Sequence, residues 1–150
     1  MLMFVVFDLD GTIANCDHRL HHIQLPAAHD AEWPEQNWDA FYAACNGDTP
    51  IWPIQAVAAA MIDQGHRVEF WTGRSDQCRP QTEQWLYDNG FDGVPVRMRV
   101  GGDRTADHRL KAAWLAEHGR PDLIFENRAA VVAMWRSHGI VCCQVAPGDF

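Results

Sequence analysis

The chain has 150 residues, 47% of them apolar, and a formal net charge of −8. This length and composition predict one compact domain with a sizeable core and argue against long disordered segments. The acidic balance argues against tight binding along a nucleic-acid backbone, which normally needs a basic stripe, but it leaves room for a local basic pocket.

The N-terminal run and the cysteines indicate a cellular location. Only seven residues precede Asp8, and they lack a basic region, so we expect neither a signal peptide nor a membrane span. The five cysteines form no C-x-x-C pair and their number is odd. We therefore expect reduced thiols, no zinc and a cytoplasmic location.

The hydrophobic pattern alternates between strands and helices along the chain. The expected strands cover residues 2–7, 67–71, 96–99, 123–125 and 140–145. The expected helices cover residues 37–45, 53–64, 80–88, 106–118 and 129–137. The alternation predicts an α/β, Rossmann-like fold with a mostly parallel five-stranded sheet flanked by helices.

The segment from about residue 15 to residue 50 is too long for a simple connection. We expect it to form a small helical cap inserted beside the strand ends, with residues 1–150 as a single domain. Because ligands bind at the carboxyl ends of the strands in such sheets, the polar residues that follow each strand are the candidates for chemistry.

The strongest candidates are Asp8 and Asp10 in "FDLDGT", directly after the first strand. One carboxylate can attack an electrophile or bind a metal, while the other donates and accepts protons. A solvated pair with a helix-capping role is the simpler alternative. The apolar run before the pair and the Gly-Thr turn after it favour the functional interpretation.

Later strand ends carry further candidates. In "VEFWTGRSD", the Thr72 hydroxyl can bond a phosphoryl oxygen and Gly73 permits close backbone approach, although Thr-Gly-Arg is also ordinary turn chemistry. Lys111 is a single lysine among eleven arginines, which indicates a need for a compact ammonium. Alternatively, Lys111 forms a surface pair with Asp107, four residues earlier.

The stretch "LIFENR" ends another strand with Glu126 and Asn127, a suitable place for a metal or a substrate. Together, these four stretches resemble the motifs of the haloacid dehalogenase superfamily of phosphotransferases. Arg19, "GDRTADHRLK" and the tail from Glu126 are similar to the 3′-phosphatase domain of bacteriophage-type polynucleotide kinase–phosphatases. The resemblance covers nearly the whole chain and is weakest over residues 20–50. A G-x-x-x-x-G-K-[ST] loop is absent, so no kinase half is expected.

The resemblance implies a role for each position. Asp8 is the nucleophile, Asp10 the general acid and base, and Thr72 and Lys111 balance charge on the phosphoryl group. The implied substrate-binding residues are Arg19, Gly73, Arg74, Asp107 and Arg128. The implied ligands of Mg²⁺, or alternatively Mn²⁺, are Asp8, Asp10, Glu126 and Asn127.

The family pattern has two aspartates where this chain has Glu126 and Asn127. Asp8 and Glu126 still balance the two charges of Mg²⁺, and Asn127 still offers a carbonyl oxygen. We therefore expect a working phosphatase with a weaker or retuned metal requirement. Asp10 would need a raised pKa to hold a proton near neutral pH, which we expect beside Asp8 and other carboxylates.

These features predict a metal-dependent phosphomonoesterase that acts through an aspartyl-phosphate and removes 3′-phosphate from polynucleotide ends or nucleotides. No membrane and no obligate protein partner are expected. Two alternatives stay open: a small-molecule nucleotidase or other phosphatase of the superfamily, and a nucleotide-binding protein that has lost its metal.

The remaining aromatic and histidine residues have simpler interpretations. Trp33, Trp38, Phe41 and Tyr42 have the chemistry to stack on bases, but the helical spacing of the last three favours a core-facing stripe. The residues His18, His21, His22 and His29 are expected in the cap or on the surface, because no further ligands follow at zinc-site spacing.

Overall fold

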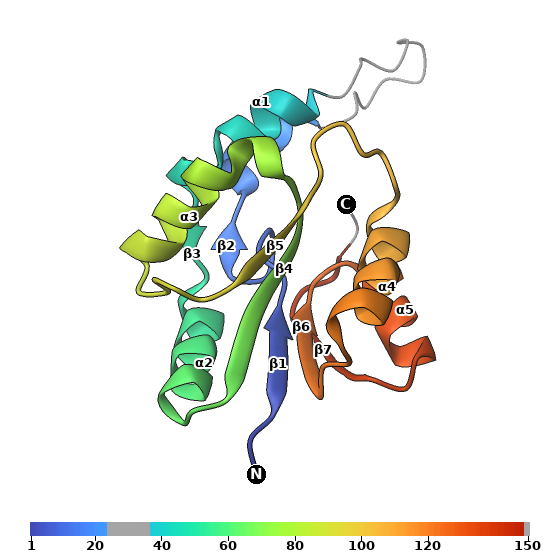
Figure 1. Ribbon diagram of the computed structural model, residues 1–150. Helices are drawn as coiled ribbons and strands as arrows, with labels where there is room; N and C mark the ends of the chain where they lie inside the picture. Colours follow the sequence, from blue (N-terminus) through green and yellow to red (C-terminus); the bar gives the residue numbers. More distant parts are fainter. Residues whose placement is uncertain (24–36, 149–150) are drawn as a thin grey trace.

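Figure 1 shows the computed structural model, which describes residues 1–23 and 37–148 and has a central sheet with helices on both faces. The sheet strands are β1 (Phe4–Phe7), β4 (Arg67–Ser75), β5 (Val96–Arg99), β6 (Leu123–Glu126) and β7 (Val141–Gln144). Their order is β5-β4-β1-β6-β7, and every neighbouring pair is parallel. The predicted fold class is confirmed.

The helices lie close to their predicted positions. They are α1 (Trp38–Ala43), α2 (Trp52–Asp63), α3 (Arg79–Asp88), α4 (Asp107–His118) and α5 (Ala129–Ser137), with 3₁₀ turns η1 (Asp17–His22), η2 (Cys45–Gly47) and η3 (Asp76–Cys78). Pro53 and Pro80 stand in the first turns of α2 and α3, where the missing N–H costs nothing.

The predicted end of β4 at Trp71 is wrong. The strand continues to Ser75, with a shift in its register against β5 between Trp71 and Ser75. The polar residues Thr72 and Arg74 ended the apolar pattern, but backbone pairing does not require apolar side chains. Such irregularities re-aim side chains at the end of a strand.

Strand β1 is buried on both faces, which explains why its sequence is a continuous apolar run. Phe4 and Val6 belong to the core that includes residues of α4 and α5. Val5 and Phe7 belong to the core on the other face, with residues of α2 and α3. Each fully buried side chain of this kind contributes about 1.5–3 kcal/mol.

A short antiparallel pair, β2 (Ala14–Asn15) with β3 (Thr49–Pro50), was missed in the sequence. It joins the loop after β1 to the segment before α2, and the Ile51 N–H donates to the Ile13 carbonyl at 2.8 Å. In Figure 1, α1 lies beyond the carboxyl ends of the strands. Part of the expected cap, residues 24–36, lies outside the described residues, so the cap and the single-domain assignment stay predictions.

Within the described ranges, none of the helices combines the length and the apolar character needed to cross a membrane.

Candidate functional site

The carboxyl ends of the parallel strands meet in a pocket of about 1100 Å³, whose lining includes Asp8, Asp10, Thr72 and Arg74. Gly11 makes the turn after β1 with φ of 78°. A Cβ added there would lie 2.3 Å from the side-chain nitrogen of Asn127, so the close approach of the two loops requires glycine.

Lys111 reaches from α4 to two carboxylates at the ends of β1 and β6. Its Nζ lies 2.8 Å from Asp8 Oδ1 and 2.8 Å from Glu126 Oε2. Lys111 is 1% exposed, so the alternative of a surface pair with Asp107 is wrong. Burial, with repulsion from Glu126, raises the pKa of Asp8 to about 8 against the attraction of Lys111.

Asp10 is held by two buried arginines. Its Oδ1 accepts from Arg19 Nη2 at 2.5 Å and from Arg74 Nη2 at 2.6 Å. Asp48, which follows η2, accepts from the same two nitrogens through Oδ2, at 2.7 and 2.9 Å, and from Arg19 Nε through Oδ1 at 2.8 Å. Two buried cations, the buried Asp48 and the partly exposed Asp10 therefore form a charge-balanced group of four side chains.

The expectation of a raised pKa for Asp10 is wrong for this arrangement. Burial by itself would raise the pKa, but attraction to Arg74 and Arg19 outweighs it, and the pKa of Asp10 is lowered. The sequence indicated neighbouring carboxylates correctly, but it did not show that two guanidinium groups contact the carboxyl directly.

Asp107, at the start of α4, connects three elements. Its Oδ1 accepts from Arg99 Nη2 at 2.6 Å and its Oδ2 from Arg128 Nη1 at 2.8 Å. Burial opposes ionisation, but attraction to Lys111, Arg128 and Arg99 lowers the pKa of Asp107. A Cβ on Gly73 would lie 2.3 Å from Asp107 Oδ1, so Gly73 makes room for this carboxylate.

Two threonine hydroxyl groups lie near the carboxyl ends of β1 and β4. Thr72 is buried, and its Oγ1 accepts from the Arg74 N–H at 3.2 Å. Thr12 is also buried, and its Oγ1 lies 3.3 Å from Asn127 Oδ1 and 3.5 Å from Asp8 Oδ2. The oxygens of Asp8 and Asn127 therefore approach the same hydroxyl.

The donor chemistry at this point fits Mg²⁺, which takes oxygen ligands and keeps several waters. Asp8 offers a carboxylate and Asn127 an amide oxygen. Both carboxylate oxygens of Glu126 already have hydrogen-bond partners. Oε1 accepts from the backbone N–H groups of Asn127 and Arg128 at 3.0 and 3.2 Å, and Oε2 accepts from Lys111. A cluster of three or more His, Cys, Asp or Glu side chains fit for a metal does not occur among the described residues.

The structure brings together every predicted site residue, and it adds three that the sequence did not assign a role. Arg99 was visible as a charged residue at a strand end, and Thr12 follows the Asp pair in "FDLDGT". Asp48 gave no signal, because it lies in the stretch where the resemblance is weakest and its partners are far away in the sequence.

The aromatic residues of α1 only partly follow the prediction of a core-facing stripe. Phe41 is buried, and the Trp38 and Tyr42 rings pack around it, with centroids 5.6 and 5.7 Å from its own. Trp38 and Tyr42 also line the pocket. Trp33 and His29 lie outside the described residues, while His18 Nε2 lies 2.8 Å from Asp48 Oδ1.

Comparison with known families gives a match over most of the chain. The family described as "Polynucleotide kinase PNKP phosphatase domain" matches residues 3–150. The structure is also similar to a chain of the Pnkp1/Rnl/Hen1 RNA repair complex, with 26% identity, a TM-score of 0.77 and 99% of this chain covered. A second structure of the Pnkp1/Rnl/Hen1 complex has 25% identity, a TM-score of 0.79 and the same coverage.

This chain spans only 44% and 48% of those two chains. A haloacid dehalogenase-like family hydrolase from Streptococcus pneumoniae shares the fold over 95% of this chain and 84% of its own length, with 13% identity and a TM-score of 0.64.

Proposed function

Since the chain belongs to the polynucleotide kinase PNKP phosphatase domain family, and thus to the haloacid dehalogenase phosphatases, we propose that it removes 3′-phosphate groups from nucleic-acid ends. The observation that carries the proposal is the arrangement of charged side chains at the carboxyl ends of the strands. There, the buried Asp8–Lys111 pair lies beside Asp10, which is held by Arg19 and Arg74.

In the proposed first step, an oxygen of Asp8 attacks phosphorus in line, and the bond from phosphorus to the leaving 3′-oxygen breaks. Asp10 gives a proton to that oxygen. Lys111, 2.8 Å from Asp8 Oδ1, favours the ionised form of Asp8 against the burial that raises its pKa. Lys111 also offsets charge on the equatorial oxygens, together with the Thr72 hydroxyl. In the second step, water attacks the aspartyl-phosphate, its proton passes to Asp10, and phosphate leaves.

Arg19 and Arg74 carry the forked donors that suit phosphate oxygens. They are also the groups that lower the pKa of Asp10. When their N–H groups turn toward a bound phosphate, Asp10 loses part of that attraction and can hold the proton that the first step needs. Asp107, Arg99 and Arg128 fix the wall of the pocket beside Gly73.

Phosphatases of this superfamily are generally Mg²⁺-dependent. We propose that the side-chain oxygens of Asp8 and Asn127 and the main-chain carbonyl of Asp10 hold Mg²⁺, or Mn²⁺ in its place. Glu126 would supply a second negative charge beside them. When bound, the ion stabilises negative charge on the phosphoryl oxygens. A cytoplasmic location and action without an obligate protein partner complete the proposal.

The direct test is phosphate release from a 3′-phosphorylated oligonucleotide, from its 5′-phosphorylated isomer and from 3′- and 5′-mononucleotides, with Mg²⁺, Mn²⁺ or EDTA. Faster release from 3′-phosphorylated substrates with a divalent ion supports the proposal. Preference for 5′-mononucleotides would instead indicate a small-molecule nucleotidase. No release from any substrate with either metal would indicate a nucleotide-binding protein.

Asn127→Asp is expected to tighten Mg²⁺ binding about tenfold, because it adds one carboxylate beside Asp8. Without metal the variant should be less stable than wild type, since the added buried charge faces Asp8. A Mg²⁺ titration followed by thermal unfolding checks both effects independently of turnover. Asn46→Asp, at an exposed position, is the control and should change neither. Equal Mg²⁺ responses of wild type and Asn127→Asp would contradict the proposed ligand.

Asp48→Asn is expected to lower kcat/KM by about tenfold or more and to destabilise the protein by about 2–4 kcal/mol. An amide would place N–H donors against the guanidinium groups of Arg19 and Arg74, which could no longer both be held in place. Steady-state kinetics and thermal unfolding measure the two effects.

The matched control for Asp48→Asn is Asp17→Asn, an exposed acid in the same segment, which should leave both measurements unchanged. Inhibition by inorganic phosphate distinguishes positioning from general damage. A positioning role predicts weaker phosphate inhibition in folded Asp48→Asn, and unchanged inhibition would contradict it.

A further inference from the structure

The pocket is larger than a site for a single phosphate group needs to be. Its volume of about 1100 Å³ slightly exceeds the usual volume of ligand sites, which reaches roughly 1,000 Å³. Beyond Asp8 and Arg74 the pocket continues between two walls. One wall is α1 with Trp38 and Tyr42, and the other is the loop from β5 to α4, residues 100–106.

The 100–106 loop is held in place by hydrogen bonds to two residues outside it, Arg99 and Asp76. Arg99 Nη1 donates to the carbonyls of Asp103 and Thr105 at 3.2 and 2.5 Å, and the Gly101 N–H donates to Asp76 Oδ1 at 2.8 Å. Arg104 stands between these anchors, lines the pocket and is exposed. Within residues 1–23 and 37–148, its guanidinium has neither a hydrogen bond nor an ion pair.

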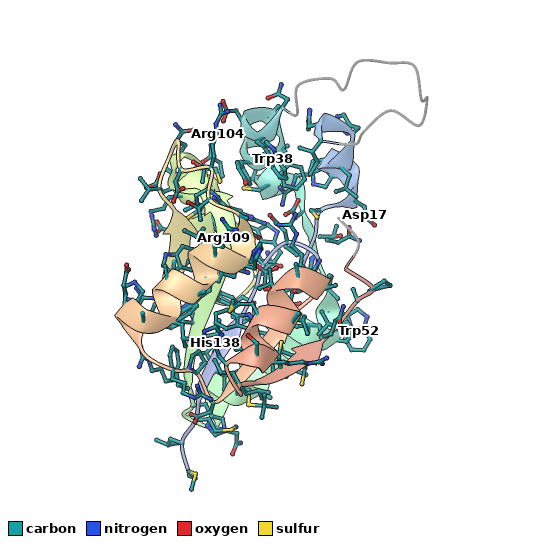
Figure 2. The ribbon with its side chains drawn as sticks, turned by 90° about the vertical axis from the view of Figure 1, so that its right-hand side faces the viewer. Asp17, Trp38, Trp52, Arg104, Arg109 and His138 are labelled. Carbon is teal, nitrogen blue, oxygen red and sulfur yellow. The ribbon has the colours of Figure 1, made fainter. Side chains whose placement is uncertain are left out.

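The opposite wall presents aromatic rings. Trp38 is half-buried, and the Tyr42 hydroxyl donates to the Gly73 carbonyl at 3.2 Å, which fixes α1 to the end of β4. In Figure 2, Trp38 and Arg104 lie at the same end of the molecule, whereas Trp52 lies well away from them. The pocket thus has an aromatic face on one wall and, on the other, a guanidinium group without a partner among the described residues. This combination matches the chemistry of a nucleotide, which has a base that can stack and a phosphate that can pair with a cation.

We propose that this part of the pocket binds one nucleotide beyond the phosphate that is removed. The base of the 3′-terminal nucleotide lies against Trp38, and Arg104 contacts the phosphate that joins this nucleotide to the one before it. The inference rests on the proposed function and narrows it: the preferred substrate is a single-stranded end at least two nucleotides long.

The other charges of these walls limit the site to one internucleotide phosphate. Asp103 and Asp39 also line the pocket. The Asp103 carboxylate accepts from the N–H and the hydroxyl of Thr105, but both acids still repel a continuous chain of phosphates. A third nucleotide is therefore expected to add little to binding, in keeping with the net charge of −8.

The first measurement compares kcat/KM for a 3′-mononucleotide, a 3′-phosphorylated dinucleotide and a trinucleotide. The dinucleotide should exceed the mononucleotide by about tenfold, roughly the effect of one well-placed contact of 1.4 kcal/mol, and the trinucleotide should match the dinucleotide. Arg104→Ala should bring the ratio of dinucleotide to mononucleotide to about one. It should also reduce the salt dependence by about one phosphate contact.

Arg109→Ala is the matched control for Arg104, because Arg109 is an exposed arginine on α4 that does not line the pocket. It should keep the wild-type ratio. Trp38→Leu should lower kcat/KM about tenfold for substrates with a terminal base but not for one that is abasic at its 3′ end, since base stacking is worth about 1–3 kcal/mol. Trp52→Leu, 72% exposed on α2, is its control.

An active wild-type enzyme with equal kcat/KM for the mononucleotide and the dinucleotide overturns the inference. So does an equal loss in Trp38→Leu with abasic and normal ends, because that pattern is structural. Failure to release phosphate from any 3′-phosphorylated substrate contradicts the proposed function instead, so the two failures are distinguishable.

Discussion

Asp8→Asn is expected to lower phosphate release by about three orders of magnitude or more, because an amide cannot form the covalent intermediate. The fold should survive. The Asn carbonyl can accept from Lys111, as Asp8 Oδ1 does at 2.8 Å, and its N–H₂ can face Thr12 Oγ1, which lies 3.5 Å from Oδ2. Phosphate release from a 3′-phosphorylated oligonucleotide measures the loss.

The same variant should be more stable than wild type, and the gain should depend on pH. The pKa of Asp8 is raised from 3.8 to about 8 by folding. A carboxyl with a raised pKa favours folding below its unfolded pKa, and that contribution is lost as pH rises through the folded pKa. Asp8→Asn removes this loss, so in EDTA its stability advantage should be largest near pH 8, at most about 5 kcal/mol, and should shrink toward pH 4.

Asp63→Asn is the control, since Asp63 is exposed at the end of α2. It should keep full activity and show no such pH-dependent gain. Residual turnover of Asp8→Asn near the wild-type rate would rule out Asp8 as the nucleophile. If Asp8→Asn is less stable than wild type at pH 8, this would instead contradict the view that the Asp8 carboxylate is destabilised by burial and by repulsion from Glu126.

Lys111→Met is expected to destabilise the protein by about 3–5 kcal/mol, because it leaves Asp8 and Glu126 buried without their shared cation. The loss should be larger at pH 8 than at pH 5. At the lower pH Asp8, whose pKa is raised by burial and by repulsion from Glu126, takes up a proton and no longer repels Glu126. Thermal or urea unfolding at the two pH values checks the prediction.

The double variant Asp8→Asn/Lys111→Met tests the cause of the loss. It removes one of the two unpaired charges, so its destabilisation should be smaller than that of Lys111→Met alone. Arg109→Met, on the exposed side of the same helix, should stay within about 0.5 kcal/mol of wild type. A pH-independent loss in Lys111→Met would indicate that packing of the side chain, and not its charge, supports the site.

The sequence determined the architecture because local patterns carry it. The apolar runs, the glycines after helices and the prolines in first turns predict the order of strands and helices, and the strands of a parallel sheet bring their carboxyl ends together. Asp8, Thr72, Arg99 and Glu126 could therefore be placed at one edge. The end of β4 was misplaced, since pairing beyond Trp71 depends on a neighbouring strand and not on local hydrophobicity.

Only the tertiary structure decided how the charges pair. The sequence separates Asp48 from Arg74 by 26 residues and Lys111 from Asp8 by 103, and no local spacing relates them. Whether a carboxyl holds its proton depends on burial and on charges a few ångströms away, which is why Asp10 and not Asp8 was wrongly expected to have the raised pKa. The residue types determine which reactions are possible, while the packing determines which side chains lie close enough to one another to take part in them.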